Sequence, residues 1–296
     1  MVTSYTAAPD IEVLTSNFPI PGYGFVPVNA FVLKGSEPIL VETGAAIERA
    51  DFMGALRAVM DPADLRWIWL SHTDFDHIGS VHQLLEENPS VRVITTFLGM
   101  GIMGLTAPLP LDRVRFVNPG ETVTLGDRTL TALKPPVFDN PCTTGFYDRT
   151  ADVLFSSDCF GALLQTVPQS AADIPAAELR DGQVLWSTID SPWLHKVDSG
   201  AFGAELETLR RLAPKTILCN HLPPAPGRLM EWFLGSLAAV PGAHPFVGPN
   251  QAAFESMLQQ MAWQPCRHGP GRPERAAAAG RPGGSKGWSR GGPVGL

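Results

Sequence analysis

The sequence is poor in cysteine, and the few cysteines that it has are dispersed. Cys142, Cys159, Cys219 and Cys266 form no C-x-x-C pair. This arrangement excludes a disulfide framework, and it also excludes a zinc site built from paired cysteines. A reducing environment is therefore the expected setting.

The sequence also lacks a long apolar run. No segment approaches the roughly 20 apolar residues that a membrane helix needs. The first residues, MVTSYTAAPDIEV, contain neither a basic region nor an apolar core, so we expect no signal peptide. We therefore expect no membrane partner and a cytoplasmic location.

Charged residues are scarce, at 17% of 296 residues, whereas hydrophobic residues make up 44%. This length is enough for one large domain or two small ones, and the composition allows a sizeable buried core. The net charge of −7 argues against a nucleic-acid-binding surface that spans the molecule.

The last 31 residues differ from the rest in composition. The segment 266–296 contains nine glycines, and its six basic residues face a single acidic one. It has no apolar periodicity and is predicted to be disordered. We therefore expect one folded domain over residues 1–265, followed by a disordered tail rich in glycine, arginine and proline.

Strands and helices are predicted to alternate over the first hundred residues, because apolar residues recur there at spacings typical of each. The predicted elements are strands 28–35 and 38–41, helix 46–60, strand 66–70, helix 81–87 and strand 91–95. This alternation is typical of layered sheets with helices packed outside them.

Short β runs divided by Pro-Gly, Gly-Asp and Pro-Pro pairs dominate the middle of the chain, and helices return afterwards. The predicted elements are strands 114–117, 122–125, 129–134 and 153–156, helix 201–212, strand 215–220, and helices 228–239 and 251–263. No internal repeat is visible.

One loop, WLSHTDFDHIGS at Trp69–Ser80, places four strong ligand donors directly after a buried strand. Imidazole and carboxylate groups are natural ligands of divalent metals. Side chains alternate along an extended segment, so the first three donors would point the same way and the fourth would not. The spacing offers two pairs of donors, which suits two metals side by side: His72 with Asp74, and Asp76 with His77. Further ligands must come from elsewhere in the chain.

A simpler alternative is that Asp74 and Asp76 cap the helix expected to begin near Ser80. Capping accounts for the two carboxylates but leaves both histidines of the loop unexplained. Metal binding accounts for all four side chains, and we therefore favour it.

The loop resembles the H-x-[HED]-x-D-H motif of the metallo-β-lactamase superfamily, and other stretches keep the order of that family's motifs. PILVETG resembles its second strand, although Glu42 replaces the usual aspartate. GETVTLGDRTLTAL resembles its Gly-[DE]-x-φ-x-φ-Gly hairpin. ADVLFSSDCFG resembles the strand that ends in the metal-bridging aspartate, which would be Asp158. TILCNHLPP resembles the strand that ends in the last ligand, which would be His221.

The acidic residue at Asp74 resembles one branch of the superfamily, the flavodiiron proteins and their oxygen-binding di-iron relatives, because the hydrolases usually have histidine there. This resemblance implies a four-layer αββα sandwich of the α/β class with a non-haem di-iron centre. Hard oxygen ligands also shift the preference from zinc toward iron or manganese.

The same resemblance has implications for cofactors and partners. The family receives electrons from FMN, often in a fused flavodoxin domain, and the stretch after Pro224 is too short for such a domain. A separate flavoprotein or other reductase is therefore the expected electron donor. A homodimer that brings the flavin near the metals is expected by analogy alone.

The sequence departs from the family pattern between the loop and Asp158. The family has a histidine there, but this chain has none between His82 and His195. The matching stretch is KPPVFDNPCTTGF, in which Phe138 or Asp139 occupies the ligand position, depending on one residue of register. Asp139 could instead begin a turn at Asn140-Pro141.

The two implied metal sites are therefore unequal. The first would be held by His72, Asp74, Asp158 and, in one register, Asp139. The second would be held by Asp76, His77, Asp158 and His221. The second set needs no further ligand, so it is expected to bind more tightly. His195 could line the mouth of the pocket with Trp193, although a plain loop histidine is the simpler reading.

Three functions fit these features. The first is a di-iron redox protein that binds or reduces O₂ or NO. The second is a metal-dependent hydrolase of an ester, thioester or phosphodiester, in which a metal lowers the pKa of bound water to about 7 and Asp76 orients that water as the catalytic residue. The third is a sensor or binding module that has lost full metal binding. We favour the first, with two iron ions preferred over zinc or manganese.

Overall fold

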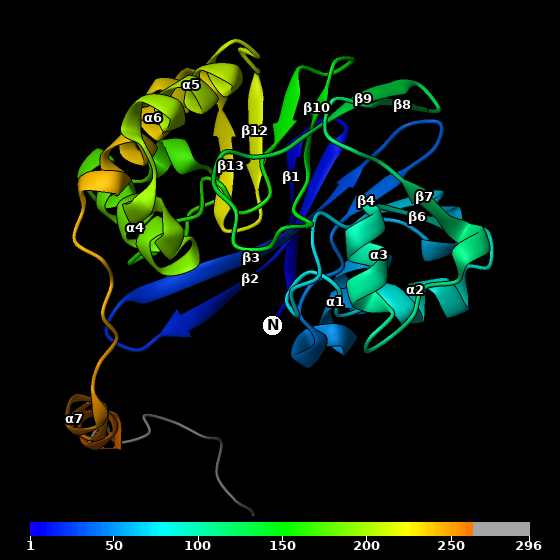
Figure 1. Ribbon diagram of the computed structural model, residues 1–296. Helices are drawn as coiled ribbons and strands as arrows, with labels where there is room; N and C mark the ends of the chain where they lie inside the picture. Colours follow the sequence, from blue (N-terminus) through cyan, green and yellow to red (C-terminus); the bar gives the residue numbers. More distant parts are fainter. Residues whose placement is uncertain (263–296) are drawn as a thin grey trace, which may run out of the picture. The chain divides into compact units, whose positions relative to one another are not determined.

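The centre of the protein is a pair of β-sheets, seen in a computed structural model that describes residues 1–262 (Figure 1). The first sheet has seven strands in chain order: β1 (Thr3–Ala8), β2 (Ile11–Ile20), β3 (Gly24–Leu33), β4 (Ile39–Val41), β5 (Trp67–Trp69), β6 (Arg92–Thr95) and β7 (Val114–Phe116). The second has six, in spatial order β13 (Leu222–Pro226), β12 (Thr216–Cys219), β11 (Val153–Phe155), β10 (Gly145–Asp148), β9 (Arg128–Leu133) and β8 (Thr122–Leu125).

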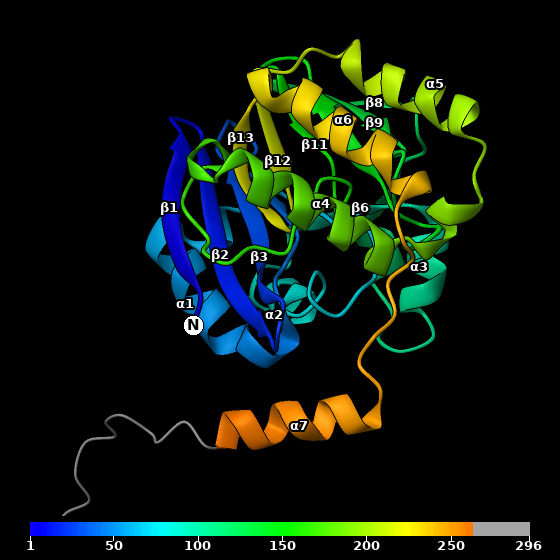
Figure 2. The ribbon, with the colours of Figure 1, turned by 90° about the vertical axis from the view of Figure 1, so that its left-hand side faces the viewer.

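Helices cover the outer faces of both sheets (Figure 1). On the first sheet lie α1 (Arg49–Val59), α2 (Val81–Glu87) and α3 (Phe97–Met103). On the second lie α4 (Ala176–Asp190), α5 (Ser199–Arg210) and α6 (Met230–Ala239), which Figure 2 shows in front of their sheet.

Alternating side chains divide the interior into three apolar cores. In β3, Phe31 faces the second sheet, whereas its neighbour Val32 packs with the helices of the first sheet. Between the sheets, the rings of Trp69 and Phe146 lie 4.9 Å apart. Strand side chains alternate between faces, so a sheet that is covered on both sides is apolar on both. The predicted four-layer αββα sandwich is therefore confirmed.

Parallel pairing brings particular strand ends to one place. β4 to β7 run parallel to one another, and β11 and β12 are parallel to each other. In parallel pairs the carboxyl ends of the strands lie at the same edge of the sheet, and ligand-binding side chains collect there. The loops after β5, β11 and β12 carry the predicted metal ligands.

The chain divides into a compact unit, Met1–Gly248, and a second unit that begins at Pro249 and whose described part includes α7 (Gln251–Ala262). The predicted tail, 266–296, lies outside the described residues, and the boundary at residue 265 stays a prediction. Among residues 1–262, no helix is both long enough and apolar enough to cross a membrane.

A buried arginine ties the two sheets together. Arg128, at the start of β9, is 4% exposed, and it donates hydrogen bonds to the main-chain oxygen of Lys34, which follows β3, and to Asp10. Its Nη1 also lies 2.5 Å from the fully buried carboxylate of Asp148 in β10. A buried charge that loses its partner is strongly destabilising.

Replacing Arg128 with methionine should therefore lower the free energy of unfolding by about 3–5 kcal/mol, because Asp148 would keep a buried charge without a partner. Urea unfolding of the full chain measures this change. Arg149→Met is a matched control, since Arg149 is exposed. Equal stability of the two variants would show that the buried pair contributes little.

Candidate metal centre

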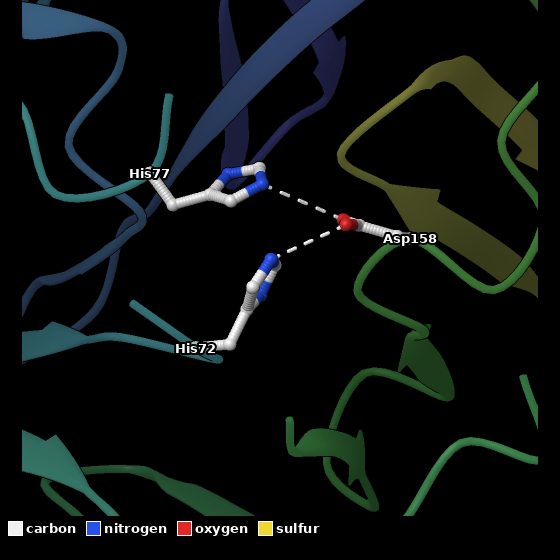
Figure 3. Close-up of side chains that lie close together, drawn as sticks. All are labelled: His72, His77 and Asp158. Atoms are coloured by element: carbon white, nitrogen blue, oxygen red, sulfur yellow. Dashed lines mark ion pairs between the residues drawn. The ribbon is translucent and has the colours of Figure 1, made fainter. Parts of the chain in front are cut away.

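The predicted ligands converge where the two sheets meet at one edge. The loop between β5 and α2 carries His72, Asp74, Asp76 and His77, and the segments after β9, β11 and β12 of the second sheet carry the others. Figure 3 shows His72 and His77 pointing from the loop toward Asp158, which follows β11 on the opposite side.

Asp158 lies between two groups of imidazoles. Its Oδ2 atom is 3.3 Å from Nε2 of His72. Its Oδ1 atom is 3.6 Å from Nε2 of His77 and 3.5 Å from Nε2 of His221. The two oxygens of this carboxylate thus lie near different imidazole nitrogens, and ligand atoms of Asp158, His72 and His77 also lie within 4.8 Å of one another.

Asp76 faces the second of these sets. Its Oδ1 atom lies 3.5 Å from Nε2 of His77, and its Oδ2 atom lies 3.5 Å from Nε2 of His221. Ligand atoms of these three residues lie within 4.8 Å of one another, close enough to surround one metal ion.

Asp139, rather than Phe138, faces the cluster. Ligand atoms of Asp139, His72 and Asp74 lie within 4.8 Å of one another. The ring of Phe138 instead lies 5.1 Å from that of Trp193, and its main-chain oxygen accepts a hydrogen bond from the Trp193 indole. The structure therefore places the Asp139 carboxylate, and not the Phe138 ring, beside His72 and Asp74.

Hydrogen bonds to the far nitrogens orient two of the imidazoles. Nδ1 of His221 is 2.9 Å from the main-chain oxygen of Pro27, to which it donates, so Nε2 is the atom left to face the cluster. Nδ1 of His72 is 2.8 Å from the Ser71 hydroxyl and 3.4 Å from that of Ser157. Such outer partners fix the ring orientation of metal-ligating histidines.

The segment Glu42-Thr43-Gly44, after β4, fixes the shape of the loop. Oε1 of Glu42 accepts the Ser71 N–H at 3.0 Å, and Thr43 donates from both its N–H and its hydroxyl to the main-chain oxygen of His77. Gly79 approaches so closely that a Cβ atom there would lie 2.3 Å from the nitrogen of Ala46. The longer side chain of Glu42 in place of the family's aspartate therefore still performs a positioning role.

The cluster is rich in negative charge, and several of its groups lack hydrogen-bond or ion-pair partners. Nε2 of His72 and both ring nitrogens of His77 are buried and make no hydrogen bond within the described structure. Among residues 1–262, no lysine or arginine forms an ion pair with the carboxylates of the cluster, which are Asp74, Asp76, Asp139, Asp158 and Asp190. Asp158 is buried, Asp139 is exposed and the other three carboxylates are partly buried. Buried charges are paired or bind metals, so Asp158 and the buried histidines beside it fit divalent cations.

The pKa values of these groups reflect the same imbalance. Burial opposes the charged form of His221, but the Asp158 carboxylate and Asp76 outweigh it and raise the His221 pKa to about 9. Burial raises the pKa of Asp139 to about 6, and the charges of Asp158 and Asp74 add to this effect while His72 opposes it. Protons thus offset part of the negative charge, and cations could take their place.

Three positioning or neighbouring residues have no sequence motif that points to them. The Asn220 amide donates to Oδ1 of Asp158 at 2.8 Å. The ring of Trp186, in α4, lies 4.5 Å from that of His221. Asp190, the last residue of α4, has a ligand atom within 4.8 Å of those of Asp139 and Asp158, and burial raises its pKa to about 8, with the charge of Asp158 adding to the effect. Trp186 and Asp190 both lie in α4, a helix that the sequence pattern did not predict.

Two other histidines lie outside the cluster. Nε2 of His82 is 3.3 Å from the main-chain oxygen of Pro108. His195 lies in a short 3-10 helix, Pro192–Lys196, and belongs to no group of metal-ligand candidates among the described residues. The capping alternative is not supported, because α2 begins after Ser80 without a side-chain cap hydrogen bond.

Comparisons with known proteins agree with this geometry. Residues 26–198, more than half of the chain, match a family model described as "ODP family beta lactamase". The chain is 31% identical over 137 residues to type A flavoprotein fprA of Rhodobacter capsulatus, a match that covers 45% of this chain and 32% of that protein. The chain thus spans about a third of the length of this curated relative.

Solved structures show the same fold. The rubredoxin oxygen:oxidoreductase of Desulfovibrio gigas superposes with a TM-score of 0.71 at 18% identity, covering 82% of this chain and 63% of that one. The flavodiiron protein of Giardia intestinalis gives 0.67 at 16% identity, covering 81% and 60%. The expected superfamily and branch are confirmed: the chain belongs to the ODP family beta lactamase group, on the flavodiiron side of the metallo-β-lactamase superfamily.

Proposed function

We propose that the cluster is a dinuclear metal centre and that the protein is a di-iron redox protein that binds or reduces O₂ or NO. The observation that carries this proposal is the position of Asp158, whose two carboxylate oxygens face two different sets of imidazole nitrogens. The names of the relatives, an oxygen oxidoreductase and a flavodiiron protein, support the same reaction class.

The ligands divide between two sites that share Asp158. His72, Asp74 and Asp139 hold the first metal, whereas Asp76, His77 and His221 hold the second. Carboxylates favour iron and manganese over zinc more than thiolates and imidazoles do. When bound, a pair of irons supplies electrons to a small diatomic molecule, and the residues of the chain hold the ions and neutralise their charge.

Asp76 acts as a ligand in this proposal and not as a base that orients water. Both of its oxygens lie 3.5 Å from imidazole nitrogens, those of His77 and His221. A general base needs a free oxygen within hydrogen-bond reach of the water that it activates. The arrangement therefore supports Asp76 as a metal ligand, and it is the names of the relatives that favour the redox function.

Electrons must reach the centre from outside the described fold. We assign the donor role to a separate flavoprotein or other reductase. The flavin names of the relatives support FMN as the cofactor of that partner. A homodimer of this chain is part of the same proposal.

The first prediction concerns the number of metals. Asp139→Ala should remove about one metal per chain, because the first site has only one imidazole and depends on carboxylates. His221→Ala should instead disturb the second site, which has two imidazoles and two carboxylates. Elemental analysis of protein purified without added metal measures both losses. If both variants kept two tightly bound metals, this division of ligands would be wrong.

The second prediction concerns pH. A metal binds only after its ligands lose their protons, and in the metal-free protein the pKa values of Asp139 and His221 are raised to about 6 and about 9. The affinity for Mn²⁺ should therefore be weak below the lower value, rise with pH, and level off above the higher one. Titration calorimetry across this range, in buffers of different ionisation enthalpy, also counts the protons released. An affinity that stayed constant with pH would contradict the proposed ligands.

The third prediction tests the reaction itself. Protein loaded anaerobically with Fe²⁺ should consume O₂ or NO when a reduced flavin donor is supplied, and His221→Ala should lose most of this activity. An oxygen or NO electrode measures the consumption. Arg149→Met, which leaves the metal centre unaltered, is the control. Purified protein that contains zinc, hydrolyses a thioester or phosphodiester and consumes neither gas would instead establish a hydrolase.

A further inference from the structure

Asp190 is the one carboxylate of the cluster that neither the family's motifs nor the proposed ligand sets include. It is the last residue of α4, which packs on the outer face of the second sheet. One of its ligand atoms lies within 4.8 Å of ligand atoms of Asp139 and Asp158. The side chain therefore reaches the first metal site from a third direction, away from the loop and from the strand ends.

The surroundings of Asp190 give it no positive partner. Oδ2 accepts a hydrogen bond from the Ser191 hydroxyl at 3.0 Å, and Asp190 forms no ion pair within the part of the chain that the structure describes. It also lies at the negative end of a helix dipole, where an acidic side chain is unfavourable.

An independent observation points to a ligand at the same place. His72 is fully buried, and its Nε2 atom makes no hydrogen bond. That atom lies 3.3 Å from Oδ2 of Asp158 and 3.9 Å from Oδ1 of Asp139. A buried ring nitrogen is therefore aimed into the same group of oxygens that Asp190 approaches, which is the environment of a cation bound by nitrogen and oxygen.

We propose that Asp190 is a further ligand of the first site, so that carboxylates from two separate segments replace the missing histidine and the site selects a hard cation such as Mn²⁺ or Fe²⁺. The site then has one imidazole, from His72, and up to four carboxylates, from Asp74, Asp139, Asp158 and Asp190. The second site keeps two imidazoles. Because oxygen ligands suit manganese and iron better than zinc, the two sites differ in metal preference as well as in affinity. This inference rests on the proposed dinuclear centre.

Mn²⁺ binding to the metal-free full chain tests the assignment, because the electron paramagnetic resonance of free Mn²⁺ counts the bound ions. Wild-type protein should bind two Mn²⁺ per chain. Asp190→Asn should weaken the second binding event by at least the roughly 10-fold loss that follows removal of even an outer partner. Titration with Zn²⁺ should show a smaller loss, since zinc depends less on carboxylates. Asp181→Asn is the matched control, because Asp181 is exposed on the same helix and belongs to none of the ligand groups.

Thermal unfolding provides a second measurement that separates binding from folding. Metal-free Asp190→Asn should melt close to the temperature of the wild type, because the amide has nearly the same shape as the carboxyl group, and Mn²⁺ should raise its melting temperature less. A folded Asp190→Asn protein that binds two Mn²⁺ with wild-type affinity would overturn the assignment. If the variant loses Mn²⁺ as expected but the iron-loaded wild type consumes neither O₂ nor NO, the redox function fails and the role of Asp190 stands.

Discussion

The rest of the site depends on one constraint: it must hold several carboxylates close together against their mutual repulsion. Five aspartates converge at one edge of the sandwich, and within residues 1–262 only histidines form ion pairs with them. Such a group stays folded only if the surrounding backbone holds it in place, or if cations replace the missing positive charge. Hydrogen bonds from Asn220 to Asp158 and from Asn140 to Asp74 help to hold the carboxylates in place. The unpartnered nitrogens of His72 and His77 are available to bind cations.

The architecture supplies rigid supports for these side chains. The two-sided burial of the central strands leaves few alternative registers, because a slip of one residue would exchange the side chains of two cores. Asn29 in β3 then donates to the main-chain oxygens of Cys219 and Leu222, on either side of the His221 turn. The first sheet thus positions a histidine that follows a strand of the second. The metal loop is fixed in the same way by Thr43 and Gly79.

The sequence predicted the parts of the structure that repeat a local pattern. Strands 28–35 and 38–41 correspond to β3 and β4, and helix 81–87 is α2. The prediction missed β1, β2, α3, β10, α4 and β13. Pro19, in β2, is a residue that usually argues against a strand, and Gly182, in α4, is a poor helix former. Gly182 is needed because a Cβ there would lie 2.3 Å from the main-chain oxygen of Leu163.

The parts of the site that follow a local sequence pattern were also predictable. The loop, Asp158 and His221 follow strand ends in a recognisable order, whereas the register at Asp139 depends on how Phe138 packs against Trp193, a contact distant in sequence. A different consequence follows from the distance along the chain between His77 and His221, which belong to the same ligand group and are separated by about half of the protein. A cation held by both ends of this span would act as a cross-link, joining the loop of one sheet to the strand ends of the other. Cross-links that close long loops restrict the unfolded chain most. Bound metal would therefore also make the two halves of the sandwich unfold together.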